Sequence, residues 1–364
     1  MKLTEVIKNT IIQKQAPIGF DEFMELALYY PQLGYYRSGS EKFGEKGDFI
    51  TAPETSDLFG FCLARQCTQV LNGDNDILEF GAGSGVLAAQ ILFELGRLKC
   101  LPKFYYILEL SSELKHRQQQ TIAKALPELL ERVIWLDKLP EGFNGVVIAN
   151  EVLDAMPAKR FMQKEGEFHE LCVDIDNGQL NWKLDDAVFQ KSTIKLPSGT
   201  DEGYTTEVNL RAMAWIDSLY EALDEAVVLI IDYGMHRDEY FHPQRFDGTL
   251  RCYYQHKASD DPFVHVGEQD ITTSVNFSDM ADQAKVSGFK VAGYATQALF
   301  LIALGIDEYL LEEQDENKRI SLAQQVKQLV LPSAMGESFK ILALSKLVHV
   351  KLIGFKEQDL SHKL

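Results

Sequence analysis

The 364-residue sequence has few cysteines and no apolar run long enough to cross a bilayer. Its five cysteines are scattered and form no C-x-x-C pair, which argues against a disulfide framework, a zinc site and a thioredoxin-type redox motif. The longest apolar stretch, 291–306, is interrupted by polar residues and is shorter than the ~20 residues that a membrane span requires. Residues 1–15 lack the pattern of a signal peptide. We therefore expect a soluble protein with reduced thiols and no metal site.

Positive charge is also scarce, because 36 Lys+Arg stand against 54 Asp+Glu and give a formal net charge of -18. A surface this acidic repels nucleic acid and anionic membranes, and it attracts basic partners or peptide segments. Acidity can also serve solubility alone, and that alternative stays open. The 46% of hydrophobic residues is ample for a core. A protein partner therefore fits the composition, whereas nucleic acid and membrane do not.

Short apolar runs alternate with helical patterns from residue 75 onward. This alternation predicts an α/β fold with a parallel sheet, crossover helices and helices on both faces. Helices are expected over 86–95, 112–130, 208–223 and 277–286. The seven expected strands cover 76–80, 104–110, 132–136, 145–150, 227–233, 289–294 and 339–345.

Other stretches interrupt this alternation and suggest a division into domains. Runs within 161–173 and 179–183 look like short antiparallel strands with Gly- and Asn-containing turns. The stretch 236–270 is loop-rich, and apolar helices around 298–306 and 309–311 could serve as core or as a homodimer face. We predict an N-terminal helical and loop cap (1–70), a Rossmann-like core (71–158, 207–235 and 277–350), a β insertion (159–206) and a substrate-side loop insertion (236–276).

A glycine-rich loop, Glu79-x-Gly81-x-Gly83-x-Gly85, follows the first expected strand and precedes a helix. Glycines let the backbone turn sharply and let a ligand lie against the peptide plane, and the helix start offers free N–H groups. NAD commonly takes G-x-G-x-x-G, with its pyrophosphate at the helix end. The strictly alternating glycines instead suit S-adenosylmethionine, which has no phosphate, with Glu79 organising the loop and the ligand's amino acid end. A simple tight turn remains the alternative.

Two further acids follow the next strands. Glu109 comes 24 residues after Gly85, at a strand end where a carboxylate accepts both ribose hydroxyls of an adenosine ligand. Its alternative role is that of a solvent-facing acid. Asp137, after the third expected strand, is in position to meet the adenine amino group.

The fourth expected strand ends in a polar segment that contains Asn150, Glu151 and Asp154. Ligands of open α/β sheets sit at the carboxyl ends of strands, so Asn150 is expected at the cofactor and the two acids at the reacting centre. If the segment is helical, the acids share a face and can grip a guanidinium by bidentate bonds. Helix capping on a solvated helix explains them equally well.

Loop residues on the substrate side form a last set of candidates. The segment 47–54 contains Asp48, Thr51 and Glu54, and glycine- and proline-punctuated loops of this kind can close over a cofactor. Arg251 and His256 follow the fifth expected strand, where a substrate channel could pass. A lone histidine is more often structural than catalytic.

The order of these motifs along the chain and their residue sequences resemble those of the MidA family. The resemblance implies a class I, Rossmann-like methyltransferase with an N-terminal helical portion and insertions, and S-adenosylmethionine as cofactor. Because the family's mitochondrial member is a complex I assembly factor and protein arginine methyltransferase, it also implies an arginine acceptor, oriented by Glu151 with Asp154 second, on a subunit of a respiratory complex. The matching strings cover 28–36, 47–54, 78–85, 149–157, 231–234, 248–256, 270–272, 296–301 and 335–340.

The sequence departs from the family pattern after 270–272, where the family tends to have His and then Asp and this chain has Ser274 and Asn276. If those positions touch substrate, the target or its chemistry differs. The transit peptide of the mitochondrial member is absent, so a bacterial cytoplasm is the expected setting. Two alternatives remain: an assembly chaperone that binds S-adenosylmethionine without turnover, and a dinucleotide-dependent oxidoreductase, which Val86 disfavours because a small residue belongs there.

Overall fold

The computed structural model describes residues 2–37, 51–189 and 195–364. Its centre is a sheet whose strands β1 (Asp76–Phe80), β2 (Tyr105–Leu108), β3 (Val133–Leu136), β4 (Phe143–Asn150) and β9 (Leu223–Met235) are parallel. The order of the seven main strands is β14-β15-β9-β4-β1-β2-β3, with a short strand β13 (Val275–Asn276) beside β9. The predicted α/β sheet is confirmed, but β15 (Phe339–Lys346) is antiparallel to both β9 and β14 (Lys290–Thr296).

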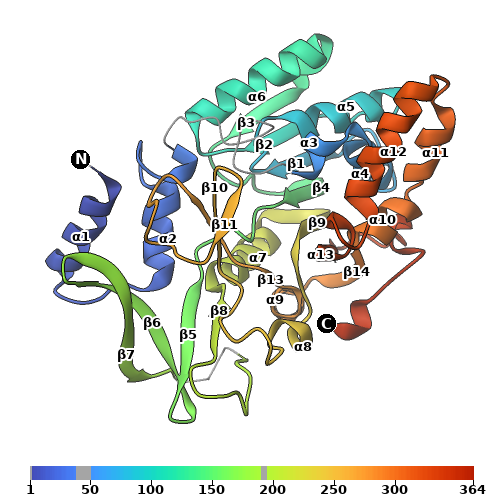
Figure 1. Ribbon diagram of the computed structural model, residues 1–364. Helices are drawn as coiled ribbons and strands as arrows, with labels where there is room; N and C mark the ends of the chain where they lie inside the picture. The colour runs from blue at the N-terminus through green and yellow to red at the C-terminus, as the bar shows by residue number, and fades with distance from the viewer. Residues whose placement is uncertain (1, 38–50, 190–194) are drawn as a thin grey trace.

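Helices cover both faces of this sheet (Figure 1). Because successive side chains of a strand point to opposite faces, Ile77 belongs to one core and Leu78 to the other. The first core packs against α4 (Asp57–Cys67), α5 (Val86–Arg97), α6 (Ser112–Ala125), α10 (Gln297–Ala303), α11 (Ile306–Glu312) and α12 (Glu316–Val330). The second packs against α7 (Leu210–Ala222) and α9 (Phe277–Ser287).

One expectation for these elements needs correction, and for one open alternative the structure supports the first interpretation. The helix expected over 112–130 ends at Ala125, because Pro127 disfavours a helical residue before it, and a 3₁₀ helix η2 (Pro127–Arg132) follows. The segments 298–306 and 309–311, which could have been core or dimer face, supply Leu301 and Tyr309 to the first core. A homodimer stays a prediction.

A second sheet is antiparallel, with β5 (Lys159–Lys164), β6 (Glu167–Asp176), β7 (Gln179–Val188) and β8 (Thr205–Val208) in the order β7-β6-β5-β8. Its two tight hairpins turn at Glu165-Gly166 and Asn177-Gly178, and all four residues have positive φ. Two-residue hairpin loops of this conformation match the twist of the flanking strands. The apolar run 161–173 is therefore divided between two strands.

The N-terminal residues contribute to two different cores. Helices α1 (Leu3–Lys14) and α2 (Phe20–Tyr29) pack against the antiparallel sheet, where the rings of Phe20 and Trp182 lie 5.0 Å apart. The helix α3 (Ala52–Thr55) instead packs with α4 and α5 on the central sheet. The predicted single cap over 1–70 thus spans both regions in Figure 1, and the division into domains stays a prediction.

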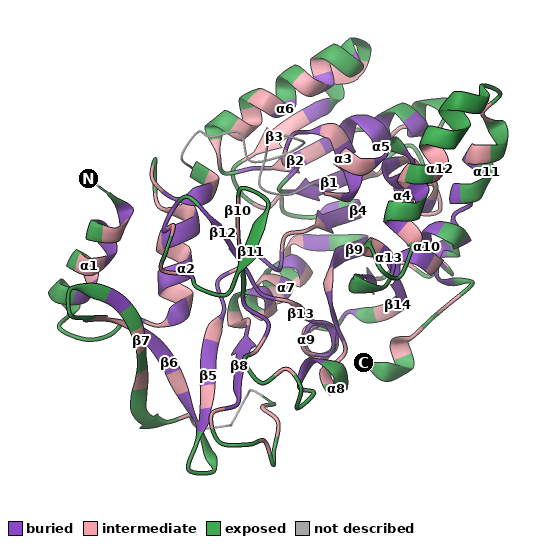
Figure 2. Cartoon of the chain, in the orientation of Figure 1, coloured by how far each residue is buried: buried purple, intermediate pink, exposed green. Residues whose placement is uncertain are grey.

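Residues 236–276, which we expected to be loops, contain α8 (Arg237–Tyr240) and a three-stranded sheet. Its strands are β10 (Arg251–Tyr254), β11 (Lys257–Ser259) and β12 (Asp270–Thr272), in the order β11-β10-β12. Strands of three or four residues are too short to show the alternation on which the prediction depended. Figure 2 shows that β12 is buried while β11 is exposed.

The remaining short elements are η1 (Tyr35–Arg37), α13 (Met335–Ser338), η3 (Ile353–Phe355) and η4 (Ser361–Lys363). None of the helices in the described ranges combines the length and the apolar character that a bilayer crossing demands. Within the same ranges, no three His, Cys, Asp or Glu side chains group as metal ligands.

Candidate active site

A cavity of about 580 Å³ opens at the carboxyl ends of β1, β2 and β4. That volume is in the range of small-molecule sites, and the place is where open α/β sheets bind ligands. Among the described residues, six acidic side chains line it against one basic side chain, that of Arg37. The acids are Glu54, Glu79, Glu109, Glu151, Asp154 and Asp270.

The glycine loop forms one wall of the cavity, and all three glycines have positive φ. Gly81 and Gly83 line the cavity, whereas Gly85 does not. A Cβ at Gly85 would lie 2.9 Å from the Cα of Gln118, so this glycine allows α5 to start against α6. The alternating glycines therefore have two uses, a cradle for a ligand and a close helix contact.

Glu79 lies at the base of this loop, 2% exposed, with the Tyr105 hydroxyl donating to its carboxylate at 2.8 Å. Burial raises the pKa of Glu79 to about 7, although the hydrogen bond from Tyr105 opposes this shift. The nearby charge of Glu109 raises it further. A cationic group next to this buried acid would stabilise its ionised form and lower its pKa again.

Glu109 follows β2 and is held by Gln118, a buried residue that sequence reasoning missed. The side-chain amide of Gln118 donates to the Glu109 carboxylate at 3.0 Å and to the Gly83 carbonyl at 3.1 Å. The Trp135 indole N–H donates to the oxygen of the same amide at 2.9 Å. One glutamine thereby connects the glycine loop, the expected ribose acid and β3, and a helical glutamine carries no sequence signal for such a role. We call residues 79–85 with Glu109 and Gln118 the glycine-loop end.

The segment after β4 brings Asn150, Glu151 and Asp154 to the cavity, but as a turn and not as the helix we considered. Glu151 has φ 51, a left-handed conformation that non-glycine residues rarely adopt and that concentrates at functional sites. The Asn150 amide donates to Glu151 at 3.2 Å. Asp232 on β9, which sequence reasoning also missed, fixes the turn by accepting the backbone N–H of Leu153 at 3.0 Å.

Burial strongly affects these acids. It raises the pKa of Glu151 to about 8, with a further rise from the charge of Asp154, while the Asn150 amide opposes the shift. Burial likewise raises the pKa of Asp154 to about 6, and it holds the pKa of Asp232 well above its ordinary value. Of these three acids, Glu151 and Asp154 line the cavity, and buried acids of this kind are suited to a cation that stabilises their ionised form.

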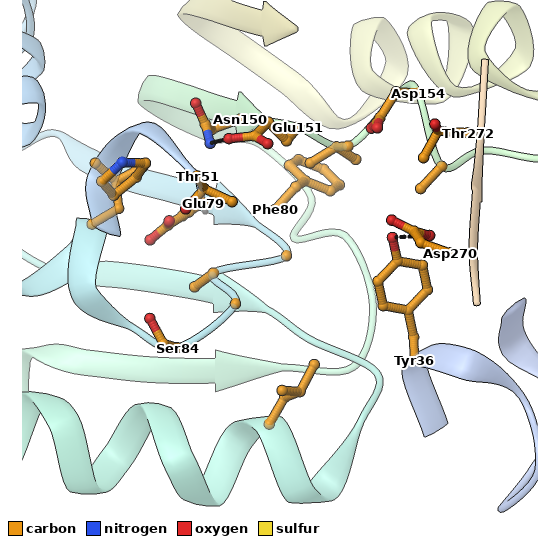
Figure 3. A pocket seen from close by; sticks show the side chains of 18 of the residues that line it. Tyr36, Thr51, Glu79, Phe80, Ser84, Asn150, Glu151, Asp154, Asp270 and Thr272 are labelled. Atoms are coloured by element: carbon orange, nitrogen blue, oxygen red, sulfur yellow. Dashed lines mark hydrogen bonds between the residues drawn. The ribbon is translucent and has the colours of Figure 1, made fainter. Parts of the chain in front are cut away.

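The other end of the cavity combines acids with tyrosines. Figure 3 shows Tyr36, Asp154, Asp270 and Thr272 on one side of Phe80, with Glu79 and Ser84 on the other. Tyr29, Tyr233 and Tyr253 also line the cavity. We call the set Tyr29, Tyr36, Asp154, Tyr233 and Asp270 the acid–tyrosine end.

Some of the substrate-side candidates line the cavity and others lie outside it. Thr51 and Glu54 line the cavity, and the Ser84 hydroxyl donates to Glu54 at 2.5 Å, which joins α3 to the glycine loop. Arg251 is instead paired with the exposed Asp260 at 2.8 Å, outside the cavity lining. His256 is exposed in the turn between β10 and β11, and Asp48 falls outside the described residues.

Three further residues of interest lie away from the cavity lining. Asp137 is exposed and forms an ion pair with Lys115 on α6. Asn276 is the N-cap of α9 and accepts the backbone N–H of Asp279. Ser274 donates its backbone N–H to Thr249 at 3.1 Å. The departure from the family pattern therefore falls on helix capping and loop packing.

The residues of the cavity fit S-adenosylmethionine. Three buried polar atoms of its lining have no hydrogen-bond partner within the described part of the chain: Asn150 Oδ1, Asp154 Oδ1 and the Tyr233 hydroxyl. Buried polar atoms of this kind are costly unless a ligand or water satisfies them. The acids suit the sulfonium and ammonium groups of the cofactor, and the cradle at Gly81 and Gly83 leaves room beside the backbone.

Comparison with known proteins agrees with this fit. Residues 62–295 match the family described as "Putative S-adenosyl-L-methionine-dependent methyltransferase". The human protein arginine methyltransferase NDUFAF7, mitochondrial, is 30% identical over 95% of this chain and 84% of its own length. The Drosophila melanogaster homolog is 28% identical over 92% of this chain and 82% of its own length.

Solved structures give the same result. A superfamily member from Burkholderia thailandensis, bound to S-adenosyl-homocysteine, has 38% sequence identity and a TM-score of 0.95. The match covers 100% of this chain and 96% of that chain. A native crystal structure of a superfamily protein from the same organism superposes with a TM-score of 0.92, at 38% sequence identity and over 100% of this chain and 96% of that chain.

Proposed function

The chain belongs to this family of S-adenosylmethionine-dependent methyltransferases, and from that membership we propose that it methylates an arginine side chain of a protein. S-adenosylmethionine is its cofactor and methyl transfer its reaction. The observation that carries the arginine proposal is the pair of buried acids, Glu151 and Asp154, which the turn after β4 brings to the cavity. Support also comes from relatives named as protein arginine methyltransferases.

The bound cofactor supplies an activated methyl group, so the protein has to align a nucleophile and exclude water. Guanidinium is a delocalised cation and a poor nucleophile. The carboxylates of Glu151 and Asp154 would accept its N–H groups and bias electron density toward the attacking nitrogen. The positive charge of a bound guanidinium also favours the ionised forms of Glu151 and Asp154. As carboxylates, these two side chains can accept the proton that is released after methyl transfer.

Binding of the cofactor is assigned to residues at the glycine-loop end. Gly81 and Gly83, which line the cavity, would provide the cradle, Glu79 would face the cationic amino acid end, and Glu109 would accept the ribose hydroxyls. Asn150 lines the cavity on the Glu79 side of Phe80 (Figure 3), and its Oδ1, which has no hydrogen-bond partner among the described residues, can accept a donor from the ligand. A role for Asp137 at the adenine would require the side chain to leave Lys115.

The identity of the acceptor protein belongs to the proposal too. We propose a subunit of a respiratory complex as the substrate and a bacterial cytoplasm as the setting. The proposal of a respiratory-complex subunit is supported by relatives that are named as mitochondrial proteins. Mass spectrometry of the proteome with and without the gene tests it, because the acceptor should lose one methylated arginine peptide.

The alternative of a cofactor-binding chaperone without turnover gains no support from Ser274 and Asn276, because neither lines the cavity. Transfer of a labelled methyl group into a lysate distinguishes the two, since a chaperone would label nothing. The dinucleotide-dependent oxidoreductase is not supported, because the chain belongs to a family of S-adenosylmethionine-dependent methyltransferases.

The variant Glu151→Gln tests the role of the acids directly. We expect methyl transfer to an arginine peptide to fall by about 100-fold, because the amide cannot accept a proton, while affinity for S-adenosylhomocysteine changes less than about threefold. Glu167→Gln, an exposed acid at the start of β6, is the control and should leave both quantities unchanged. Equal loss of cofactor affinity and turnover would contradict the substrate-orienting role.

A further inference from the structure

The acid–tyrosine end contains a carboxylate, Asp270, for which the chemistry above has no use. Asp270 begins β12, is 2% exposed and lines the cavity. The Tyr36 hydroxyl donates to its Oδ1 at 2.9 Å, and the backbone N–H of Ile271 donates to the same oxygen at 3.0 Å. Two donors on one oxygen fix the orientation of the carboxylate, as a binding group requires.

A second carboxylate, Asp154, reaches this space from a different segment. The N–H of Thr273, immediately after β12, donates to the backbone carbonyl of Asp154 at 3.0 Å, so the two segments are hydrogen-bonded to each other. Asp154 is 6% exposed, and its Oδ1 lacks a hydrogen-bond partner among the described residues. Figure 3 shows both side chains at the same end of the cavity. The Tyr233 hydroxyl lies beside this carboxylate and favours its ionised form. A ligand with several N–H donors would complete the hydrogen bonds of both groups.

Tyrosine rings complete this end. The rings of Tyr29 and Tyr36 stack at 5.5 Å between centroids, with 26° between their planes. The Tyr29 hydroxyl donates to the carbonyl of Ala155 at 3.0 Å, which fixes α2 beside the residue after Asp154. Burial and the charge of Asp270 raise the pKa of both tyrosines, so both rings stay neutral. Aromatic faces next to carboxylates stabilise planar cations.

We infer that the acid–tyrosine end is a guanidinium-selective site in which Asp154 and Asp270 bind the cation from two segments and Tyr36 positions Asp270. This inference rests on the proposed function and deepens it. Guanidinium presents five N–H donors in one plane and can bond two carboxylates at once. The ammonium of lysine is a compact, strongly hydrated charge that gains less from such a pair. The site therefore selects arginine over lysine acceptors.

Binding of N-acetyl-arginine amide and N-acetyl-lysine amide to the full chain saturated with S-adenosylhomocysteine tests this site by calorimetry. We expect the arginine probe to bind at least about tenfold more tightly than the lysine probe. Asp270→Asn should weaken the arginine probe by about tenfold or more and leave affinity for S-adenosylhomocysteine within about twofold. Asp260→Asn is the matched control, an exposed acid near the same small sheet that pairs with Arg251, and it should change neither quantity.

Tyr36→Phe covers the case in which Asp270→Asn fails to fold, since it removes one hydrogen bond and keeps the ring. It should weaken the arginine probe by about threefold to tenfold. Equal affinity for the two probes, or unchanged arginine affinity in Asp270→Asn or Tyr36→Phe, overturns the inference. If the arginine probe binds as expected but no arginine peptide is ever methylated, the proposed function fails and the cation site stands. If arginine peptides are methylated with an unchanged KM in Asp270→Asn, the cation site fails and the function stands.

Discussion

The two ends of the cavity differ in how the chain builds them. The glycine-loop end comes from one continuous stretch, 79–118, which supplies a strand, a loop, a helix, a second strand and a buried glutamine. The acid–tyrosine end takes its residues from α2, η1, the turn after β4, β9 and β12. One end is therefore a local unit, and the other exists only when distant segments pack together.

This difference has an energetic side. Residues that are close in sequence lose little loop-closure entropy on meeting, whereas Tyr36 and Asp270 are 234 positions apart. Their hydrogen bond depends on the core that α1 and α2 share with the antiparallel sheet and β12. Changes in the glycine-loop end should thus act on the cofactor first, and changes in the shared core should act on the acceptor end.

The largest effect is expected for Gly85→Ala. The added Cβ would lie 2.9 Å from the Cα of Gln118 at a φ of +83, so α5 or α6 has to move. We expect affinity for S-adenosylhomocysteine to fall by about 100-fold or more, measured by calorimetry. Gly73→Ala is the control, because its φ is +93 but nothing lies within 4 Å. It should cost about 1 kcal/mol of stability and no affinity. A Gly85→Ala protein with normal affinity would contradict the close-contact role.

Gln118→Leu tests whether the buried glutamine positions the glycine-loop end. It removes the donor to Glu109 Oε2, while the backbone N–H of Ser111 still donates to Oε1, and it leaves the Trp135 indole N–H without its acceptor. Affinity for S-adenosylmethionine should fall by roughly 10- to 30-fold with little change in the KM of the acceptor. The exposed Gln120 on the same helix, changed to Leu, should leave affinity unchanged. An equal rise in the KM of the acceptor would mean that the two ends are not separable.

The pH dependence of binding should distinguish cofactor from product. Glu151 is assigned to the reacting centre, where the sulfonium would lie, and its pKa is raised to about 8, so it loses its proton between about pH 7 and about pH 9. Glu79 is assigned to the amino acid end, which carries the same charge in both ligands, so its ionisation should affect both affinities alike. Cationic S-adenosylmethionine gains from the ionisation of Glu151, and its product, which lacks the sulfonium charge, gains less. The ratio of their affinities should increase by about tenfold over that range. A ratio that does not depend on pH would contradict the placement of Glu151 near the sulfonium.

The same acids affect the stability of the empty protein. Folding raises their pKa above the ordinary value of 4.5, so the folded state binds more protons at intermediate pH. Stability should be highest below about pH 4.5 as far as these two groups are concerned, and it should fall as pH rises to about 8. Saturating S-adenosylmethionine should reduce that loss in thermal denaturation.

The smallest effect is expected for Asn276→Ala, outside both ends of the cavity. The change removes the N-cap of α9 and should cost about 1 kcal/mol in denaturant unfolding. Cofactor affinity and acceptor KM should stay unchanged, and Asn276→Ser should retain most of the stability. A change in KM for Asn276→Ala would show that the departure from the family pattern reaches the acceptor.

The sequence by itself determined the central sheet, the glycine loop and Glu109, because strand and helix periods, turn glycines and the acid after the second strand are local signals. Only the tertiary structure decided the direction of β15, the sheet within 236–276, and the roles of Gln118, Asp232 and Asp270. All of these features depend on strand pairing and burial between segments that are distant in sequence. The residues next to a position in the sequence do not show which distant segment will pack against it. The exposed ion pairs of Asp137 and Arg251 belong here too, since a strand-end or loop position does not fix where a long side chain points.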